Sequence, residues 1–417
     1  MLKKGNNRIK CMVCLGFCIL CLSACQAAES GQNRVDVTPQ TILQPEAENG
    51  TKSGAGAGTQ VTLGEESALL HKTDHSGKFC YEQLSDTEKL WYADMYAIMN
   101  GMHTNVTLSL KGNAEIGEAG IDKIFQCVMN DYPELFFVKG YTYTVYTHGT
   151  KISKISFSGT YTMTEEERRE KQLLIDTAVE KALAGIATDA SDYEKVKYVY
   201  EYVIKSTDYN MDAPDNQNIC SVFIGGESVC QGYAKAAQYM LEQLGIPATL
   251  VVGTVYGTES HAWNLVYADD AWYYVDTTWG DASYRMAEDA EGAGVQLPAI
   301  SYDYLCVTTE QLLKTHTIEN VVELPLCENM ENNYYVREGA FFTAYDETAL
   351  RAFFERNVES GKTEVMIQCA DRAVFDMFLQ ELITNQRIFR FLSSPDGTVA
   401  YIEDPDKFSM TFWLVNE

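Results

Sequence analysis

A cysteine, a histidine and an aspartate follow one another along the chain in segments that suit a nucleophile, a base and an orienting acid: Cys230, His261 and Asp276. A cysteine attacks an electrophile as its thiolate, which a helix N-terminus or a neighbouring imidazolium stabilises. A histidine held by a carboxylate has a fixed tautomer and can take and return a proton. Together, in this order, the three residues predict nucleophilic attack through sulfur.

The cysteine opens a segment with the pattern of a helix. Apolar side chains recur after it at helical spacing, and Gly245 with Pro247 ends the segment. We therefore expect Cys230 in the first turn, where free backbone N–H groups and the helix dipole favour negative charge on the sulfur. We expect Ser228 to be the N-cap of this helix.

The other two residues fall on segments that predict consecutive strands of one hairpin, with His261 at the start of the first strand and Asp276 near the end of the second. If Asp269 and Asp270 form a two-residue loop, the two side chains project from the same face of the sheet. A four-residue loop keeps this arrangement. A loop of three or five residues sends them to opposite faces, because strand side chains alternate.

The segments around the three residues resemble those of a known family. Ser-Val-Cys-Gln-Gly-Tyr-Ala (228–234), His-Ala-Trp-Asn (261–264) and Tyr-Val-Asp-Thr-Thr-Trp (274–279) are similar to the three core motifs of the bacterial transglutaminase-like superfamily. This superfamily joins transglutaminases with papain-like cysteine peptidases. The resemblance implies an α+β fold, in which a helix bearing the cysteine packs on an antiparallel sheet bearing the histidine and the aspartate, with smaller α+β domains on either side.

The resemblance also implies roles: Cys230 as nucleophile, His261 as general base and acid, and Asp276 as the group that orients the imidazole. The motifs are specific for the superfamily and weak for the substrate, because the same core hosts hydrolysis, amide transfer and inactive binding versions. Crosslinking transglutaminases of the animal type place a tryptophan well upstream of the cysteine as an oxyanion donor. This chain has no tryptophan between Trp91 and Trp263, which favours peptidase-like chemistry over crosslinking.

The first 24 residues have the pattern of a bacterial lipoprotein leader. A basic head precedes a short apolar run that ends in Leu-Ser-Ala-Cys at positions 22–25, and the run is too short for a stable membrane-spanning helix. We expect cleavage before Cys25 and lipid on its sulfur. The lipid would anchor the protein to the outer face of the bacterial cell membrane. An ordinary secretory leader is the alternative.

The net charge and the spacing of the cysteines argue against several classes of protein and of site. The formal net charge is −27, so we expect the chain to avoid nucleic acid and anionic lipid, and membrane association to come from the anchor. The seven cysteines beyond Cys25 are scattered, without the spacing of a zinc site or a dense disulfide framework. We expect no metal and no cofactor, while the pairing of these cysteines and the oligomeric state stay open.

Composition and periodicity divide the remaining chain into four stretches. Residues 25–78 are rich in small and polar residues, which indicates a flexible tether. Residues 79–163 predict an N-terminal α+β region with two helices and a hairpin, residues 164–331 the catalytic domain, and residues 332–417 a small α+β domain. The clearest elements expected in the last stretch are helices at 349–358 and 372–383 and strands at 364–369 and 387–392.

These observations predict a surface-anchored thiol enzyme. Its cysteine would attack an amide carbonyl, form a thioester and lose the acyl group to water or an amine, with peptide hydrolysis slightly favoured. Cell-surface proteins or wall peptides would be the substrates. The alternative is a non-catalytic display module that keeps the fold for binding. A Cys-His-His wall endopeptidase fits less well, because the partner strand carries a carboxylate.

Overall fold

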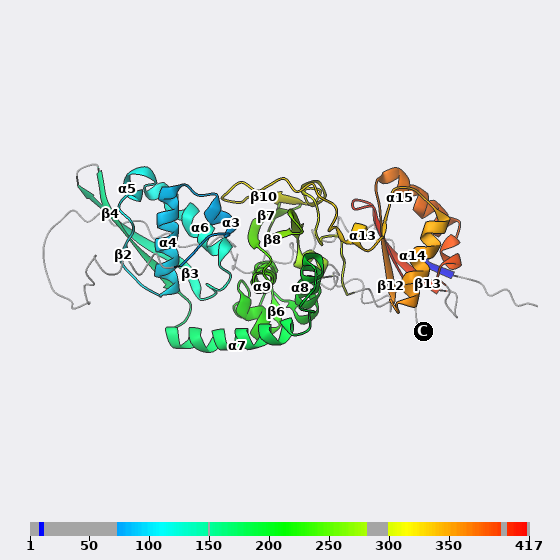
Figure 1. Cartoon of the computed structure of the whole chain (residues 1–417), viewed down its shortest axis with the longest axis horizontal. Coiled ribbons are helices and arrows are strands. Elements are labelled where there is room, and N and C mark those ends of the chain that lie inside the picture. Colours follow the sequence, from blue (N-terminus) through cyan, green and yellow to red (C-terminus); the bar gives the residue numbers. More distant parts are fainter. Residues whose placement is uncertain (1–7, 12–72, 149–150, 282–298, 393–397, 415–417) are drawn as a thin grey trace, which may run out of the picture. The chain divides into compact units, whose positions relative to one another are not determined.

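The computed structural model describes residues 8–11, 73–148, 151–281, 299–392 and 398–414. The chain divides into two compact units, whose helices and strands are labelled in Figure 1. The first unit comprises Met1–Asn33, Ala271–Thr315 and Leu326–Glu417, and the second comprises Arg34–Asp270 and His316–Pro325.

The second unit begins with helices and a three-stranded sheet of order β2-β4-β3. These are the two long helices and the hairpin that the sequence predicts, here α4, α6 and β3–β4. A capping box between Ser85 and Glu88 starts α4. The bounds are α3 (Phe79–Glu82), α4 (Asp86–Asn100), β2 (Val106–Thr107), α5 (Gly112–Glu115), a 3-10 turn (Glu118–Gly120), α6 (Ile121–Asp131), β3 (Val138–His148) and β4 (Lys151–Tyr161).

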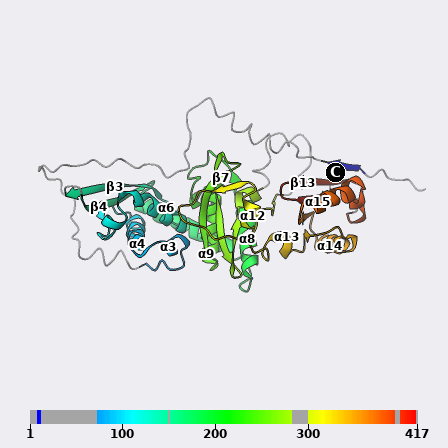
Figure 2. The same ribbon diagram turned by 90° about the horizontal axis from the view of Figure 1, so that it is seen from above.

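The rest of the second unit is built from three helices and an antiparallel sheet in the order β10-β7-β8. Helix α9 packs against β7 and β8 (Figure 2). The bounds are α7 (Glu165–Leu183), α8 (Asp192–Ser206), β5 (Asp208–Tyr209), a π-helical turn (Ser221–Gly225), β6 (Glu227–Ser228), α9 (Cys230–Gln243), β7 (Ala248–Val255), β8 (Glu259–Ala268) and β10 (His316–Ile318).

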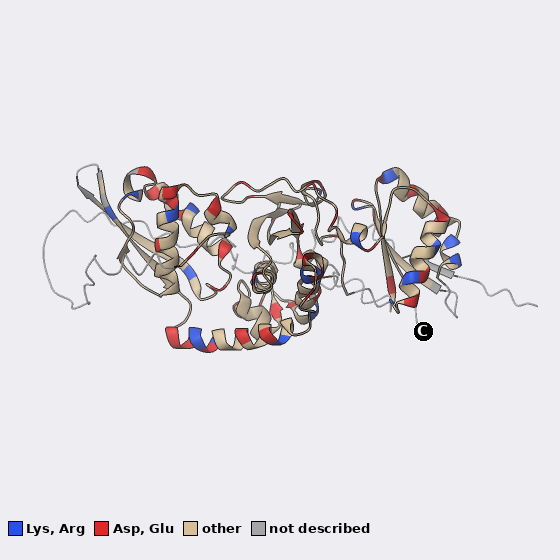
Figure 3. Ribbon diagram, in the orientation of Figure 1, with Lys and Arg blue, Asp and Glu red and all other residues tan. Residues whose placement is uncertain are grey.

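Helix α7 carries acidic and basic residues along its length (Figure 3), and its two ends complement the helix dipole. Glu165, Glu166 and Glu167 lie in its first turn and Lys181 in its last, which complements the positive N-terminal and negative C-terminal ends. Thr164 and Glu167 form a capping box. The helix therefore begins where local chemistry alone would start it.

The first unit contains a mixed sheet of order β1-β13-β14-β12-β11. The bounds of the helices and strands of this unit are β1 (Arg8–Cys11), β9 (Ala271–Val275), α10 (Thr277–Gly280), α12 (Thr309–Leu312), α13 (Tyr334–Arg337), β11 (Phe341–Phe342), α14 (Glu347–Glu359), β12 (Glu364–Cys369), α15 (Arg372–Phe378), a π-helical turn (Leu379–Thr384), a 3-10 helix (Arg387–Arg390), β13 (Thr398–Asp404) and β14 (Ser409–Leu414). Strand β12 and helices α14 and α15 confirm three of the elements expected there.

The strand expected at 387–392 is wrong, because this segment contains a 3-10 helix. Arg387 and Arg390 lie three residues apart, and their side chains reach the same carboxylate, that of Glu347, at 3.3 and 3.1 Å. A strand would spread these two arginines along about 10 Å and onto opposite faces. The shared ion pair therefore favours the tighter helical turn.

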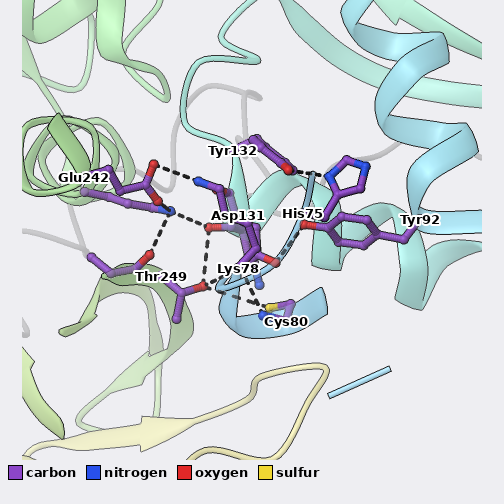
Figure 4. Close-up of polar contacts among 11 residues, drawn as sticks. His75, Lys78, Cys80, Tyr92, Asp131, Tyr132, Glu242 and Thr249 are labelled. Carbon is purple, nitrogen blue, oxygen red and sulfur yellow. Dashed lines mark hydrogen bonds and ion pairs between the residues drawn. The ribbon is translucent and has the colours of Figure 1, made fainter. Parts of the chain in front are cut away.

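A buried carboxylate at the end of α6 joins helices and sheet within the second unit (Figure 4). Asp131 is fully buried. It accepts hydrogen bonds from the backbone N–H groups of Cys80 and Tyr81, both at 3.1 Å, from the Tyr92 hydroxyl at 2.8 Å and from the Thr249 hydroxyl at 3.2 Å. Burial raises the pKa of Asp131, and these hydrogen bonds oppose the rise.

The same network extends to the last turn of α9. The Lys78 ammonium donates to the backbone oxygen of Asp131 and to the Glu242 carboxylate, both at 2.8 Å. The Gln238 amide donates to the backbone oxygens of Asn130 at 3.0 Å and Ala248 at 3.3 Å. The C-terminal half of α9 is thereby fixed to α6 and to the start of β7.

The network predicts a pH dependence of stability. Burial raises the pKa of Glu242 from 4.5 to about 7, with Lys78 opposing the rise. Because the folded state holds this proton more tightly than the unfolded state, its contribution is full at low pH and is lost as pH rises through about 7. The urea midpoint should fall between about pH 5 and pH 8, and Glu242→Gln should flatten this slope.

Glu180→Gln, an exposed change on α7, is the matched control and should keep the slope of the parent. Asp131 and Glu134 also have pKa values raised by burial, so part of the slope should survive in Glu242→Gln. Parallel pH profiles for the parent and Glu242→Gln would show that Glu242 does not hold the proton.

Candidate functional site

Cys230 is the first residue of α9, as the sequence predicts, and 6% of it is exposed. The N-cap is Val229, so the prediction of Ser228 is wrong. The Ser228 hydroxyl is already engaged, since it donates to the backbone oxygen of Asn216 at 2.9 Å. No side chain caps α9, and helix geometry leaves the N–H groups of its first turn without partners inside the helix.

Gly232 has a packing role in the first turn of α9. A Cβ atom here would lie 1.9 Å from the hydroxyl oxygen of Ser228, 2.8 Å from the backbone oxygen of Asn216 and 2.9 Å from the hydroxyl oxygen of Ser221. The two serine hydroxyl oxygens are 2.7 Å apart. The absence of a side chain at Gly232 therefore lets a hydroxyl cluster lie directly against the turn that carries Cys230.

His261 lies on β8 and is 3% exposed. Its ring stacks on that of Trp263, with centroids 5.8 Å apart and an interplanar angle of 23°. The ring of His316, the first residue of β10, lies 5.5 Å from that of His261. The histidine that the sequence selects as a base thus belongs to a buried cluster of three rings.

The elements expected to carry nucleophile and base pack together. Ala234 on α9 forms a core cluster with Leu250 on β7 and Ala262 on β8. Ala234 is one helical turn from Cys230, and Ala262 is the residue after His261. This packing brings the two elements together through the face of β8 that carries Ala262. His261 projects from the other face, because strand side chains alternate, and the approach of sulfur to imidazole stays a prediction.

Asp276 lies in the first unit and is 1% exposed. It follows β9 and is the N-cap of α10, where one carboxylate oxygen accepts the backbone N–H groups of Thr278 at 3.0 Å and Trp279 at 3.1 Å. Its own N–H donates to the backbone oxygen of Tyr304 at 3.1 Å. The local fold therefore holds the Asp276 side chain in a defined orientation.

The turn between β8 and β9 has the length that the triad requires. Strand β8 ends at Ala268 and β9 begins at Ala271. Asp269 and Asp270 separate them, with φ values of 47° and 63°. Positive φ at both central residues is typical of a type I′ hairpin turn. The role of Asp276 as partner of His261 stays a prediction.

The remaining predicted site residue, Cys25, lies outside the described residues. Among the described residues, seven cysteines lie outside any disulfide and are buried, with Cys230 among them. Burial raises the pKa of Cys220 to about 12 and that of Cys327 to about 11. These neutral thiols are poor nucleophiles near neutral pH, which makes them useful comparators for Cys230.

His316 lies beside His261, a contact that the sequence did not predict. The two histidines are far apart along the chain, and no spacing rule pairs them. One ring nitrogen of each lies within 4.8 Å of the other.

Gly232→Ala should destabilise the protein. Alanine gains about 1 kcal/mol of helix propensity, but displacing the Ser228 hydroxyl and the Asn216 backbone costs about 1–3 kcal/mol. We expect a net loss of about 1–2 kcal/mol in urea unfolding. Gly225→Ala is the control, because its Cβ would meet nothing within 4 Å. A Gly232→Ala variant as stable as the parent would contradict this packing role.

One segment of the chain matches a family model. Residues 180–277, which include Cys230, His261 and Asp276, match the model of the transglutaminase-like superfamily. Kyphoscoliosis peptidase from Mus musculus is 23% identical over 126 residues, covering 26% of this chain and 19% of that protein. The chain thus spans about a fifth of the curated relative.

Two solved structures show low overall similarity to the chain. A TGase crystal structure has a TM-score of 0.25 and 18% identity, covering 38% of this chain and 54% of that one. The periplasmic domain of TgpA from Pseudomonas aeruginosa has a TM-score of 0.22 and 18% identity, covering 34% and 59%. On the match of the family model, the chain carries an α+β domain of the transglutaminase-like superfamily.

Proposed function

We propose that this protein is a thiol hydrolase that cleaves amide bonds through a thioester on Cys230. The observation that carries the proposal is the position of Cys230 at the first residue of α9, a helix that packs on β8, the strand that carries His261. A sulfur at this point faces the positive end of the helix dipole and its free N–H groups. Both features favour a thiolate.

The reaction follows from the types of side chain. The thiolate of Cys230 attacks the carbonyl carbon, and the backbone N–H groups of the first turn stabilise the oxyanion. His261 protonates the leaving amine and then activates water, which releases the acyl group from sulfur. We propose that Asp276 orients the imidazole; the support is that a two-residue turn and strand alternation predict both side chains on one face of the hairpin.

We propose that the enzyme works outside the cytoplasm, anchored by lipid on Cys25. The support is the leader-like pattern of the first 24 residues. None of the helices in the described residues could cross a bilayer. If the leader is removed, β1 is lost with it, and β13, β14, β12 and β11 still pair with one another. Substrates within reach are surface proteins and wall peptides.

The first test is the reactivity of the thiol. At about pH 6.5, below the pKa of about 8.5 of an ordinary cysteine, iodoacetamide should alkylate Cys230 at least about tenfold faster than the other six thiols, measured by peptide mass spectrometry. His261→Ala should abolish this advantage, whereas His103→Ala, a change at an exposed residue, should keep it. Equal rates for all thiols in the parent would favour the non-catalytic display module.

The second test separates hydrolysis from transfer. The full chain is incubated with purified wall fragments, and separately with a glutamine-rich protein and a labelled amine. We expect released fragments and little incorporated label, because the chain lacks the upstream tryptophan of crosslinking enzymes. Cys230→Ser should remove the activity. Label incorporation without fragment release would reassign the enzyme to amide transfer.

A further inference from the structure

We infer that His316 is a positioning residue for the imidazole of His261. The inference rests on the proposed function, in which His261 is the base. His316 lies on β10, a short strand at the far side of β7 from β8. No part of the Cys-His-Asp reaction described above uses it.

The two histidine rings meet above β7. His261 pairs in register with Gly253, and His316 pairs with Val255 two residues along the same strand. Gly253 and Val255 therefore share one face of β7, and the two histidines project on that face. The centroids of their rings are 5.5 Å apart with an interplanar angle of 57°. Both residues are 3% exposed.

Gly253 makes this approach possible. A Cβ atom at Gly253 would lie 2.9 Å from the ring of Trp263 and 1.9 Å from the backbone oxygen of Thr317. The Trp263 ring occupies this space, stacking on His261 and meeting His316 edge-on at a centroid distance of 4.9 Å and 75°. The absence of one side chain from β7 thus allows three rings from two other strands to pack together.

The chemistry of the pair gives His316 more than a packing role. Ring nitrogens of His261 and His316 lie within 4.8 Å, which is within reach of one bridging water. Two imidazolium ions at this separation in a buried site repel each other. When His261 carries the proton of a thiolate–imidazolium pair, a neutral His316 would avoid this repulsion and offer one donor and one acceptor nitrogen. A polar neighbour of this kind limits rotation of the His261 ring, which Trp263 packing alone would not.

The elements next to the two histidines carry further ionisable groups. Strand β7 carries none. Asp276 is the predicted partner of His261 from the following strand. The remaining ionisable side chains on β8 and α9 are Glu259, Tyr267, Cys230, Tyr233, Lys235, Tyr239 and Glu242.

The test compares His316→Phe, which keeps a ring and removes both nitrogens, with His316→Gln, which keeps an N–H donor. The readout is the rate of Cys230 alkylation by iodoacetamide in the full chain against pH, with a urea midpoint for each variant. In His316→Phe we expect the alkylation rate of Cys230 to reach a plateau about tenfold lower, and the midpoint of its rise with pH to lie about half a pH unit higher. The reason is that a less fixed imidazole stabilises the thiolate less. His316→Gln should recover part of both. His103→Phe is the matched control and should follow the parent.

The outcomes separate this inference from the proposed function. Fast, His261-dependent alkylation in the parent together with a shifted profile in His316→Phe supports both. The same parent behaviour with an unshifted profile in His316→Phe overturns the role of His316 and leaves the proposed function standing. Absence of fast alkylation in the parent overturns both. If His316→Phe does not fold, His316→Leu takes its place, since Leu also removes both ring nitrogens, and a profile identical to the parent would overturn the inference.

Discussion

The buried carboxylate of Asp131 is the constraint on which the second unit depends. It accepts four hydrogen bonds from three separate parts of the chain, namely the start of α3, helix α4 and strand β7. Removing any single donor would leave a buried acceptor partly unsatisfied, which is costlier than never forming the bond. The N-terminal helices are therefore part of the platform on which β7 and α9 pack, and α9 carries Cys230.

Both ends of α9 are held, by different chemistry. At its C-terminal half, Glu242 and Gln238 are tied to Lys78 and to backbone oxygens of α6 and β7. At its first turn, Gly232 admits the hydroxyl cluster of Ser228 and Ser221. A helix held at both ends positions a sulfur more closely than a loop would, which is what a nucleophile needs.

Local patterns predicted much of this architecture. The start of α9 and the two-residue turn at Asp269 and Asp270 follow from hydrophobic spacing and turn chemistry, both of which act within a few residues. The N-cap of α9 did not follow, because the hydroxyl of Ser228 is taken by Asn216, which lies in a preceding loop. Likewise, the helical turn at 387–390 depends on Glu347, far earlier in the chain.

The partners of Asp131 and the position of His316 had no signal in the sequence for a related reason. An aspartate or a histidine is the same letter in the sequence whether or not its side chain contacts a distant residue. Their contacts are set by tertiary packing, such as the register of β10 on β7. A sequence motif can identify reactive residues because a given reaction needs particular side-chain types. Residues that support them can be of several types, so only their position in the fold identifies them.

The burial of the candidate site bears on the kind of substrate it can take. Cys230, His261 and Asp276 are 6%, 3% and 1% exposed, so little of the reactive surface faces solvent. Under the proposed function, an extended segment would present its backbone amide to such a sulfur more readily than a rigid, folded surface would present a side chain. Low exposure would also limit water near the proposed thioester, so the proposed hydrolysis would depend on His261 to hold and activate water.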